Sequence, residues 1–260
     1  MSEVQSLPLG QTRVTATKKP DAGRYFYSAS AILLFVLMFL GFQQFYLHGK
    51  AFPDRPLAPP IRGLLIGHGI AMSLWMLLFV LQPLLVASGN KRMHMSLGKI
   101  GAVLAACIIG LGMFTAIQSA KFTPPEARIW GLPGKNFMAV PVVSIIVFAG
   151  YVAIGVLTRK NPAIHRPMMF MAVMSTMSAP IARIDYLSSM YHLTVWEQVF
   201  GPFFMTLVVA GILFVIKSIL TRSFDKFYAI GLAVLVAFNW FTWAIAPTDA
   251  WLRIANALTK

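Results

Sequence analysis

The chain is dominated by apolar runs that are long enough to cross a lipid bilayer. A membrane-spanning helix needs roughly 20 mainly apolar residues. Seven windows of this sequence qualify, namely Tyr27–Leu47, Gly63–Ser88, Leu97–Ala120, Phe137–Leu157, Pro167–Leu187, Val199–Leu220 and Phe227–Ala246. The breaks between them hold charges and turn formers. We therefore expect an all-α, polytopic transmembrane helix bundle of about seven spans, which forms one domain over residues 25–246.

Composition excludes the main soluble alternatives. Of the 260 residues, 58% are hydrophobic and only 12% are charged, whereas soluble domains average about 45–50% apolar and about 25% charged residues. The net charge of +14 comes from basic residues between the apolar runs, which is typical of loops that orient a membrane protein and contact anionic lipid headgroups. We therefore expect a lipid bilayer as partner and no nucleic acid. Cys107 is the only cysteine, so no intramolecular disulfide forms.

The distribution of Lys and Arg predicts an orientation. With the N-terminus in the cytoplasm, 13 of these residues fall on inner segments and 8 on outer segments. The fifth loop, Ser188–Gln198, has none and lies outside in this arrangement. The excess of basic residues on cytoplasmic loops therefore favours an inside N-terminus and an outside C-terminus.

Both ends of the chain differ from the apolar centre. Residues 1–24 are polar and lack aromatic residues, which predicts a disordered cytoplasmic tail. In residues 247–260, Thr248 suits a helix cap, and one helical face collects Trp251, Ile254, Ala255 and Leu258. This segment is expected to form a short amphipathic helix on the outer membrane surface.

Polar residues inside the apolar windows are informative, because a charge at mid-membrane costs about 2.5–3.5 kcal/mol on insertion scales. His68, Trp75 and Gln82 are spaced by seven residues, so they share one helix stripe that should face the bundle. His68 lies toward the outer end. It is either a histidine hydrogen-bonded to a neighbouring helix, or a metal ligand, haem ligand or proton carrier.

The fifth window carries a second polar group, made of Thr176, Pro180, Arg183 and Asp185. Pro180 lacks an N–H and frees the carbonyl of Thr176, which predicts a kink. Arg183 and Asp185 are two residues apart, about 200° around a helix, so each needs a partner elsewhere. His68 is at a similar depth, and we expect it to meet Asp185. These residues form either a polar intramembrane site or an interfacial anchor for the helix end.

The five histidines sort by membrane side. His48, His68 and His192 lie toward the outside, whereas His94 and His165 lie toward the cytoplasm, each just before a window begins. A two-haem electron-transfer bundle uses such an arrangement, because bis-histidine ligation needs imidazoles from facing helices. His94 and His165 are therefore candidate metal ligands. The alternative is that they are ordinary headgroup-facing residues, and that His192 belongs to an interfacial belt.

Methionines flank His94 and His165 and suggest a soft metal such as Cu(I). Methionine is also a common apolar packing residue, so we consider a copper site a weaker hypothesis than a haem site. The sequence contains no Gly-rich phosphate loop, no HExxH motif and no GxSxG nucleophile elbow.

Two stretches carry a family resemblance. The first begins with HGIAM at His68, continues with Gln82 and ends with RMHMSLGK around His94; the second is RKNPAIHRPMMF around His165, closing at Arg183. Together they resemble an uncharacterised family of bacterial multi-pass membrane proteins, a domain of unknown function, over roughly residues 63–187. The resemblance implies a location in the bacterial inner membrane.

More distantly, these histidines resemble those of transmembrane b-type cytochromes of the ascorbate and ferric-reductase kind, in which two histidines on helices two apart hold each haem. That resemblance implies an inner haem on His94 and His165 and an outer site at His68, with His192 as its partner. Arg183 would balance a haem propionate or a semiquinone. This chain departs from the pattern because His192 falls in a loop.

Three functions follow as hypotheses. The first is a haem-b or quinone-linked electron-transfer protein. The second is a cofactor-free transporter, or a protein that binds a small molecule or lipid, with His68, Gln82, Arg183 and Asp185 lining an outward-facing cavity. The third is a non-catalytic subunit packed against other membrane proteins.

Overall fold

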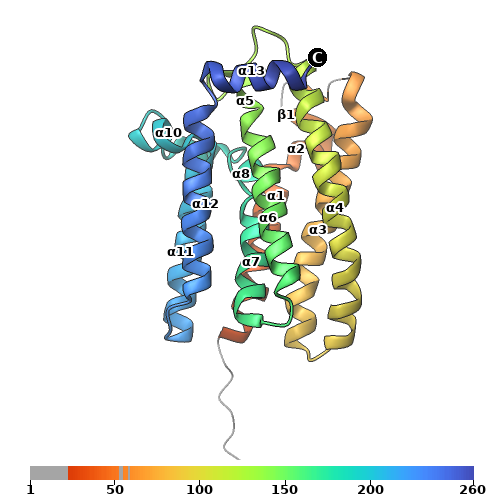
Figure 1. Cartoon of the computed structure of the whole chain (residues 1–260), viewed down its shortest axis with the longest axis vertical. Helices are drawn as coiled ribbons and strands as arrows, with labels where there is room; N and C mark the ends of the chain where they lie inside the picture. Colours follow the sequence, from red (N-terminus) through yellow and green to blue (C-terminus); the bar gives the residue numbers. More distant parts are fainter. Residues whose placement is uncertain (1–22, 53–54, 58) are drawn as a thin grey trace, which may run out of the picture.

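The computed structural model describes residues 23–52, 55–57 and 59–260, and its helices form an elongated bundle (Figure 1). Helix α13 (Asp249–Leu258) lies across one end, which we call the α13 end. The opposite end carries the turn Ser88–Asn90 between helices α3 and α4, and we call it the hairpin end. The predicted tail lies outside the described residues, except that helix α1 already begins at Gly23.

Long helices make up the bundle, and short elements connect them. The long helices are α1 (Gly23–Gly41), α3 (Arg62–Ala87), α4 (Lys91–Phe122), α6 (Ala139–Leu157), α7 (Pro162–Met174), α11 (Phe204–Thr221) and α12 (Lys226–Ile245). The short ones are α2 (Gln43–His48), α5 (Gly134–Phe137), α8 (Ser178–Ile181), α9 (Asp185–Ser189), α10 (Val195–Phe200), η1 (Pro59–Ile61) and η2 (Gly201–Phe203). Strands β1 (Lys50–Phe52) and β2 (Arg55–Pro56) pair antiparallel, as do β3 (Arg128–Ile129) and β4 (Leu132–Pro133).

The prediction of an all-α helix bundle is confirmed, and the bundle suits a multi-pass membrane protein. Among the described residues, five helical segments are long and apolar enough to cross a membrane, namely Pro59–Ala87, Lys91–Phe122, Gly134–Leu157, Val195–Thr221 and Lys226–Ile245. The apolar segment Tyr25–Gly41 is shorter. The first and fifth predicted windows therefore do not appear as single long helices.

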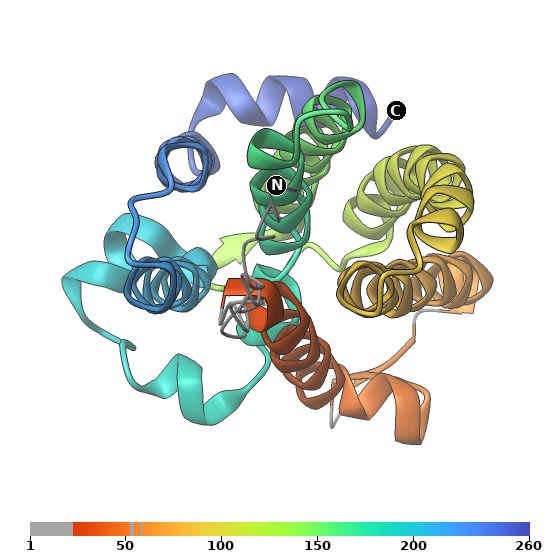
Figure 2. The ribbon, with the colours of Figure 1, turned by 90° about the horizontal axis from the view of Figure 1, so that it is seen from below.

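Helix α7 is the central helix of the bundle, with α3 and α4 on one side and α11 and α12 on the other (Figure 2). Its residues Phe170–Met174 are fully buried. Neighbouring helices approach α7 closely at glycines: a Cβ at Gly155 of α6 would stand 2.6 Å from the Met169 sulfur. Small residues of this kind let membrane helices pack by van der Waals contact.

Helix α7 ends at Met174, well before the predicted limit of Leu187. The Ser175 hydroxyl donates to the Ala172 carbonyl and the Thr176 hydroxyl to the Val173 carbonyl, both at 2.8 Å. Such bonds compete with the helix ladder, and Pro180 has no N–H to return to the carbonyl of Thr176. The helix thus breaks one turn before Pro180, and α8 and α9 follow as short pieces.

Helix α1 ends where it meets α8. A Cβ at Gly41 would stand 2.1 Å from the Pro180 carbonyl oxygen, so only glycine fits there. The chain turns at Phe42 and continues as α2, where Tyr46 Oη and Ser73 Oγ of α3 are hydrogen-bonded at 2.8 Å. The single predicted span Tyr27–Leu47 is therefore two helices.

Helix α13 is present as predicted, but its apolar face is divided. Trp251 and Ala255 are buried against the bundle, whereas Ile254 and Leu258 stay 48% and 44% exposed. The Trp251 indole N–H donates to the Lys135 carbonyl at 3.0 Å, which fastens α13 to α5. The helix packs on the protein as well as presenting apolar side chains outward.

The contact between Gly41 and Pro180 predicts a position-specific effect of alanine. Gly41→Ala should lower the free energy of unfolding by about 1–3 kcal/mol, because backbone atoms must shift to admit the methyl group. Gly110→Ala on α4 is the matched control, since a Cβ there meets open space. Thermal unfolding of both variants in detergent measures the difference, and equal melting temperatures would contradict the packing.

Candidate functional site

The hairpin end brings together the two histidines that the sequence places near the cytoplasm. His94 lies in the first turn of α4, which Asn90 caps by accepting from the Met93 N–H at 3.1 Å. His165 lies in the first turn of α7. Their ring centres are 6.3 Å apart and their planes make an angle of 87°.

The His165 ring is held by helix α6. Its Nδ1 lies 2.7 Å from the Gly155 carbonyl oxygen, which can only accept, so Nδ1 carries the proton and donates. In this tautomer of the neutral ring, Nε2 is the nitrogen that carries the lone pair. A backbone carbonyl behind Nδ1 is the usual support of a histidine that ligates a metal through Nε2.

Gln82 of α3 holds the His94 segment. Its amide satisfies all its neighbours when the oxygen accepts from the Gly98 N–H (3.1 Å) and the nitrogen donates to the His94 carbonyl (3.3 Å) and to His94 Nδ1. The amide thus bridges a carbonyl and an N–H one turn apart on α4. Gly98 lies beside this amide, since a Cβ there would be in ordinary van der Waals contact with Gln82 Nε2, at 4.0 Å.

Positive charge surrounds the pair. Arg166 lies close enough to act electrostatically on the His94 ring and on Tyr27 of α1. Further exposed basic residues at this end are Lys91, Arg92, Arg159, Lys160, Arg222 and Lys226. The described residues contain no group of three or more His, Cys, Asp or Glu side chains placed to hold a metal ion, so within them the candidate ligands at this end are the two histidines.

A second charged cluster at the hairpin end was missed in the sequence. Lys217 of α11 is only 8% exposed, pairs with the Asp225 carboxylate and donates to Tyr27 Oη at 2.9 Å. The other Asp225 oxygen caps α12 by accepting from the Phe227 and Tyr228 N–H groups at 3.1 and 3.0 Å. The cluster joins α1, α11 and α12, and its sequence signal is a lysine near the end of an apolar run with an aspartate eight residues later.

The predicted outer histidine pair does not form. His192 is 62% exposed and its Nδ1 lies 3.0 Å from Glu197 Oε1. His68 instead packs against α4, with its Cε1 3.3 Å from where a Cβ on Gly112 would stand, and its buried Nδ1 meets no hydrogen-bond partner among the described residues. The reason is local: Glu197 also accepts from the Leu193 N–H at 2.6 Å, so His192 is bonded within its own loop.

The other predicted polar residues also separate. Arg183 donates to the Ala179 carbonyl at 2.6 Å and lies 4.9 Å from the Phe42 ring centre, remote from the His94–His165 pair. Asp185 is exposed at the start of α9, so the expected contact with His68 is absent. The Thr176 hydroxyl donates to the Val173 carbonyl, and the Gln82 amide contacts His94. These residues do not line one cavity.

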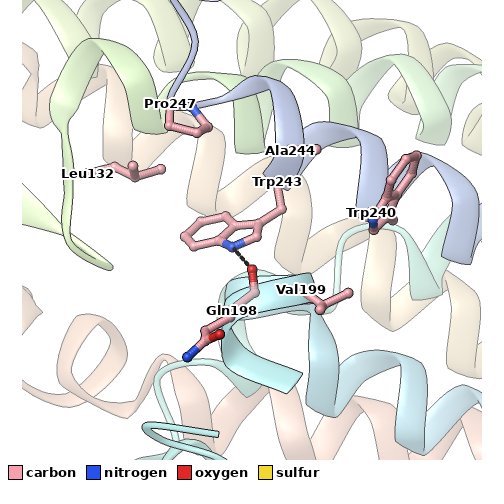
Figure 3. Close-up of a pocket in the computed structure, with 7 residues that line it drawn as sticks. All are labelled: Leu132, Gln198, Val199, Trp240, Trp243, Ala244 and Pro247. Atoms are coloured by element: carbon pink, nitrogen blue, oxygen red, sulfur yellow. Dashed lines mark hydrogen bonds between the residues drawn. The ribbon is translucent and has the colours of Figure 1, made fainter. Parts of the chain in front are cut away.

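A hollow of about 390 Å³ opens near the α13 end, between α10, α12 and the β3–β4 hairpin (Figure 3). Its walls include Leu132, Val199, Trp240 and Trp243, and the Trp243 indole N–H donates to the Gln198 carbonyl at 3.1 Å. None of the lining side chains titrates. Nearby, burial and then the Glu197 charge raise the pKa of the Tyr191 hydroxyl, which therefore stays neutral. The hollow offers apolar surface and no acid–base chemistry.

The cluster of Lys217, Asp225 and Tyr27 predicts the outcome of a double-mutant cycle on stability. Lys217→Met should lower the free energy of unfolding by about 3 kcal/mol, because it leaves the Asp225 carboxylate without its partner. The double variant Lys217→Met/Asp225→Asn should recover most of that loss, since Asn still caps a helix. Unfolding in detergent measures these two variants and the single variant Asp225→Asn, and additive losses would argue against the pair.

We compared the chain with protein-family models, with curated proteins and with solved structures, and nothing matched.

Proposed function

We propose that this is a seven-span protein of the bacterial inner membrane with its N-terminus in the cytoplasm. Two crossings would be added to the five long segments. One would be α1, and the other would be α7 together with α8. Support comes from the basic residues at the hairpin end, which the positive-inside preference puts on the cytoplasmic side. The His94–His165 pair then faces the cytoplasmic edge of the bilayer.

We further propose that this pair holds a haem b and that the protein transfers electrons. The observation that carries the proposal is the ring separation. Two imidazoles on opposite sides of one metal, with bonds of about 2 Å, hold their ring centres about 6 Å apart, and the separation here is 6.3 Å. The His165 ring already has its Nδ1 occupied and its Nε2 available.

Two further features suit the cofactor. Gly98, one turn beyond His94, is exposed and carries no side chain, and a Cβ there would meet only Gln82 Nε2, at 4.0 Å, so the surface beside His94 is open enough to admit a flat ring. Arg166 supplies positive charge beside His94, which suits a carboxylate of the cofactor. Ligation through His94 Nε2 also requires the Gln82 amide to turn, so that its oxygen accepts from Nδ1–H.

Haem b supplies reversible one-electron exchange at its iron when bound. The chain's own residues would then do three things. His94 and His165 hold the metal from α4 and α7, the Gly155 carbonyl and Gln82 orient the two rings, and Arg166 offsets negative charge. No outer histidine pair supports a second haem in the described structure, and the dispersed outer polar residues favour no transport site.

The absorption spectrum tests the proposal. Protein made with ample haem should show reduced-minus-oxidised α and Soret bands of haem b. His94→Ala and His165→Ala should each abolish or shift these bands, because each variant removes one of the two side chains that would hold the haem. His192→Ala, in the exposed loop, is the matched control and should keep the spectrum. A flat spectrum from folded wild-type protein would overturn the proposal.

The open surface at Gly98 gives a separate prediction. Gly98→Leu should reduce haem content strongly, because the new side chain occupies the space beside His94. Gly110→Leu on the same helix, where a Cβ meets open space, should leave haem content unchanged. Haem per protein is measured by pyridine haemochrome. If both variants bind haem like the wild type, the ring does not lie over Gly98.

A further inference from the structure

A lipid-facing groove runs between α1 and α11 and has a volume of about 270 Å³. Its sides include Tyr25, Ala29 and Leu33 of α1, and Leu213, Ile216 and Leu220 of α11. The two helices run in opposite directions, so Tyr25 and Leu220 mark its hairpin end. Eight residues of helix at 1.5 Å each give a length of about 12 Å along the bundle axis.

The groove has the shape and polarity of an acyl-chain site. It follows the helix axes, as lipid chains do, and its lining is almost entirely apolar. Ala29, a small exposed residue, leaves the middle of the groove unfilled, while Ser30 beneath it is buried. Within a bilayer such a space is occupied by hydrocarbon, since water finds no partner there.

The hairpin end of the groove is positively charged. Arg222 follows Leu220 by two residues and Lys226 begins α12, and both side chains are exposed. The acidic residue between them, Asp225, is engaged by Lys217 and by the first turn of α12. Arg222 and Lys226 thus lie in the connection that follows the α11 side of the groove, at its hairpin end.

We infer that this groove binds one anionic phospholipid, with an acyl chain between α1 and α11 and the headgroup phosphate at Arg222 and Lys226. Charge complementarity decides for an anionic headgroup, because each basic residue near a membrane surface attracts anionic lipid. The inference is independent of the haem proposal, since neither His94 nor His165 lines the groove.

Native mass spectrometry of the full-length protein tests this inference. The protein is released from bilayers that contain equal amounts of phosphatidylglycerol and phosphatidylcholine. The wild type should retain one phosphatidylglycerol. Ala29→Phe should lose it, because the ring fills the groove, whereas Ala153→Phe on the exposed face of α6 should keep it.

The headgroup is tested by charge removal. Arg222→Gln/Lys226→Gln should reduce the preference for phosphatidylglycerol about fivefold for each charge removed. Lys91→Gln/Lys160→Gln, two exposed residues in other turns of the same end, should keep the preference. Retention of phosphatidylglycerol by Ala29→Phe, equal losses in both charge variants, or cross-linking of two copies through Ala29→Cys would each overturn the inference.

Discussion

The close approach of α7 to its neighbours is the contact on which the rest of the bundle depends. Its methionines fill the space left by glycines: Met169 lies against Gly155 of α6, and Met171 against Gly231 of α12. In a lipid environment helices associate through such packing and not through a difference in polarity. The same Gly155 supplies the carbonyl that orients His165, so the packing of α7 and the geometry of the histidine pair share one residue.

Much of the architecture was readable from the sequence, because length and polarity alone select spanning helices. Five predicted windows correspond to long apolar helices. The other two windows, the first and the fifth, are interrupted by contacts that a hydropathy pattern does not predict. Gly41 meets the Pro180 carbonyl across the bundle, and the hydroxyls of Ser175 and Thr176 end α7 early. Such breaks depend on tertiary neighbours and on side-chain rotamers.

The candidate site could also be predicted from the sequence only in part. His94 and His165 lie inside the first turns of α4 and α7 and not before these helices, and their rings stand 6.3 Å apart, with Gln82 and Gly98 beside His94. The predicted outer pair of His68 and His192 does not form, because the depth of a residue in the membrane does not determine which helices face each other. His68 packs against Gly112, and His192 lies beside Glu197. Lys217 was missed because an apolar run ending in a basic residue usually indicates only a membrane boundary.

The Gln82 bridge has a consequence for the pairing of α3 and α4. Of the most apolar window in α3, only 11% is buried, and α3 meets α4 at glycines, as where Leu78 packs against Gly101. Apolar surfaces of this kind resemble one another after a slide of one helical turn. An amide that must reach the His94 carbonyl and the Gly98 N–H together allows a single axial register. One polar side chain thereby selects the alignment of two helices whose apolar surfaces leave several alignments nearly equivalent.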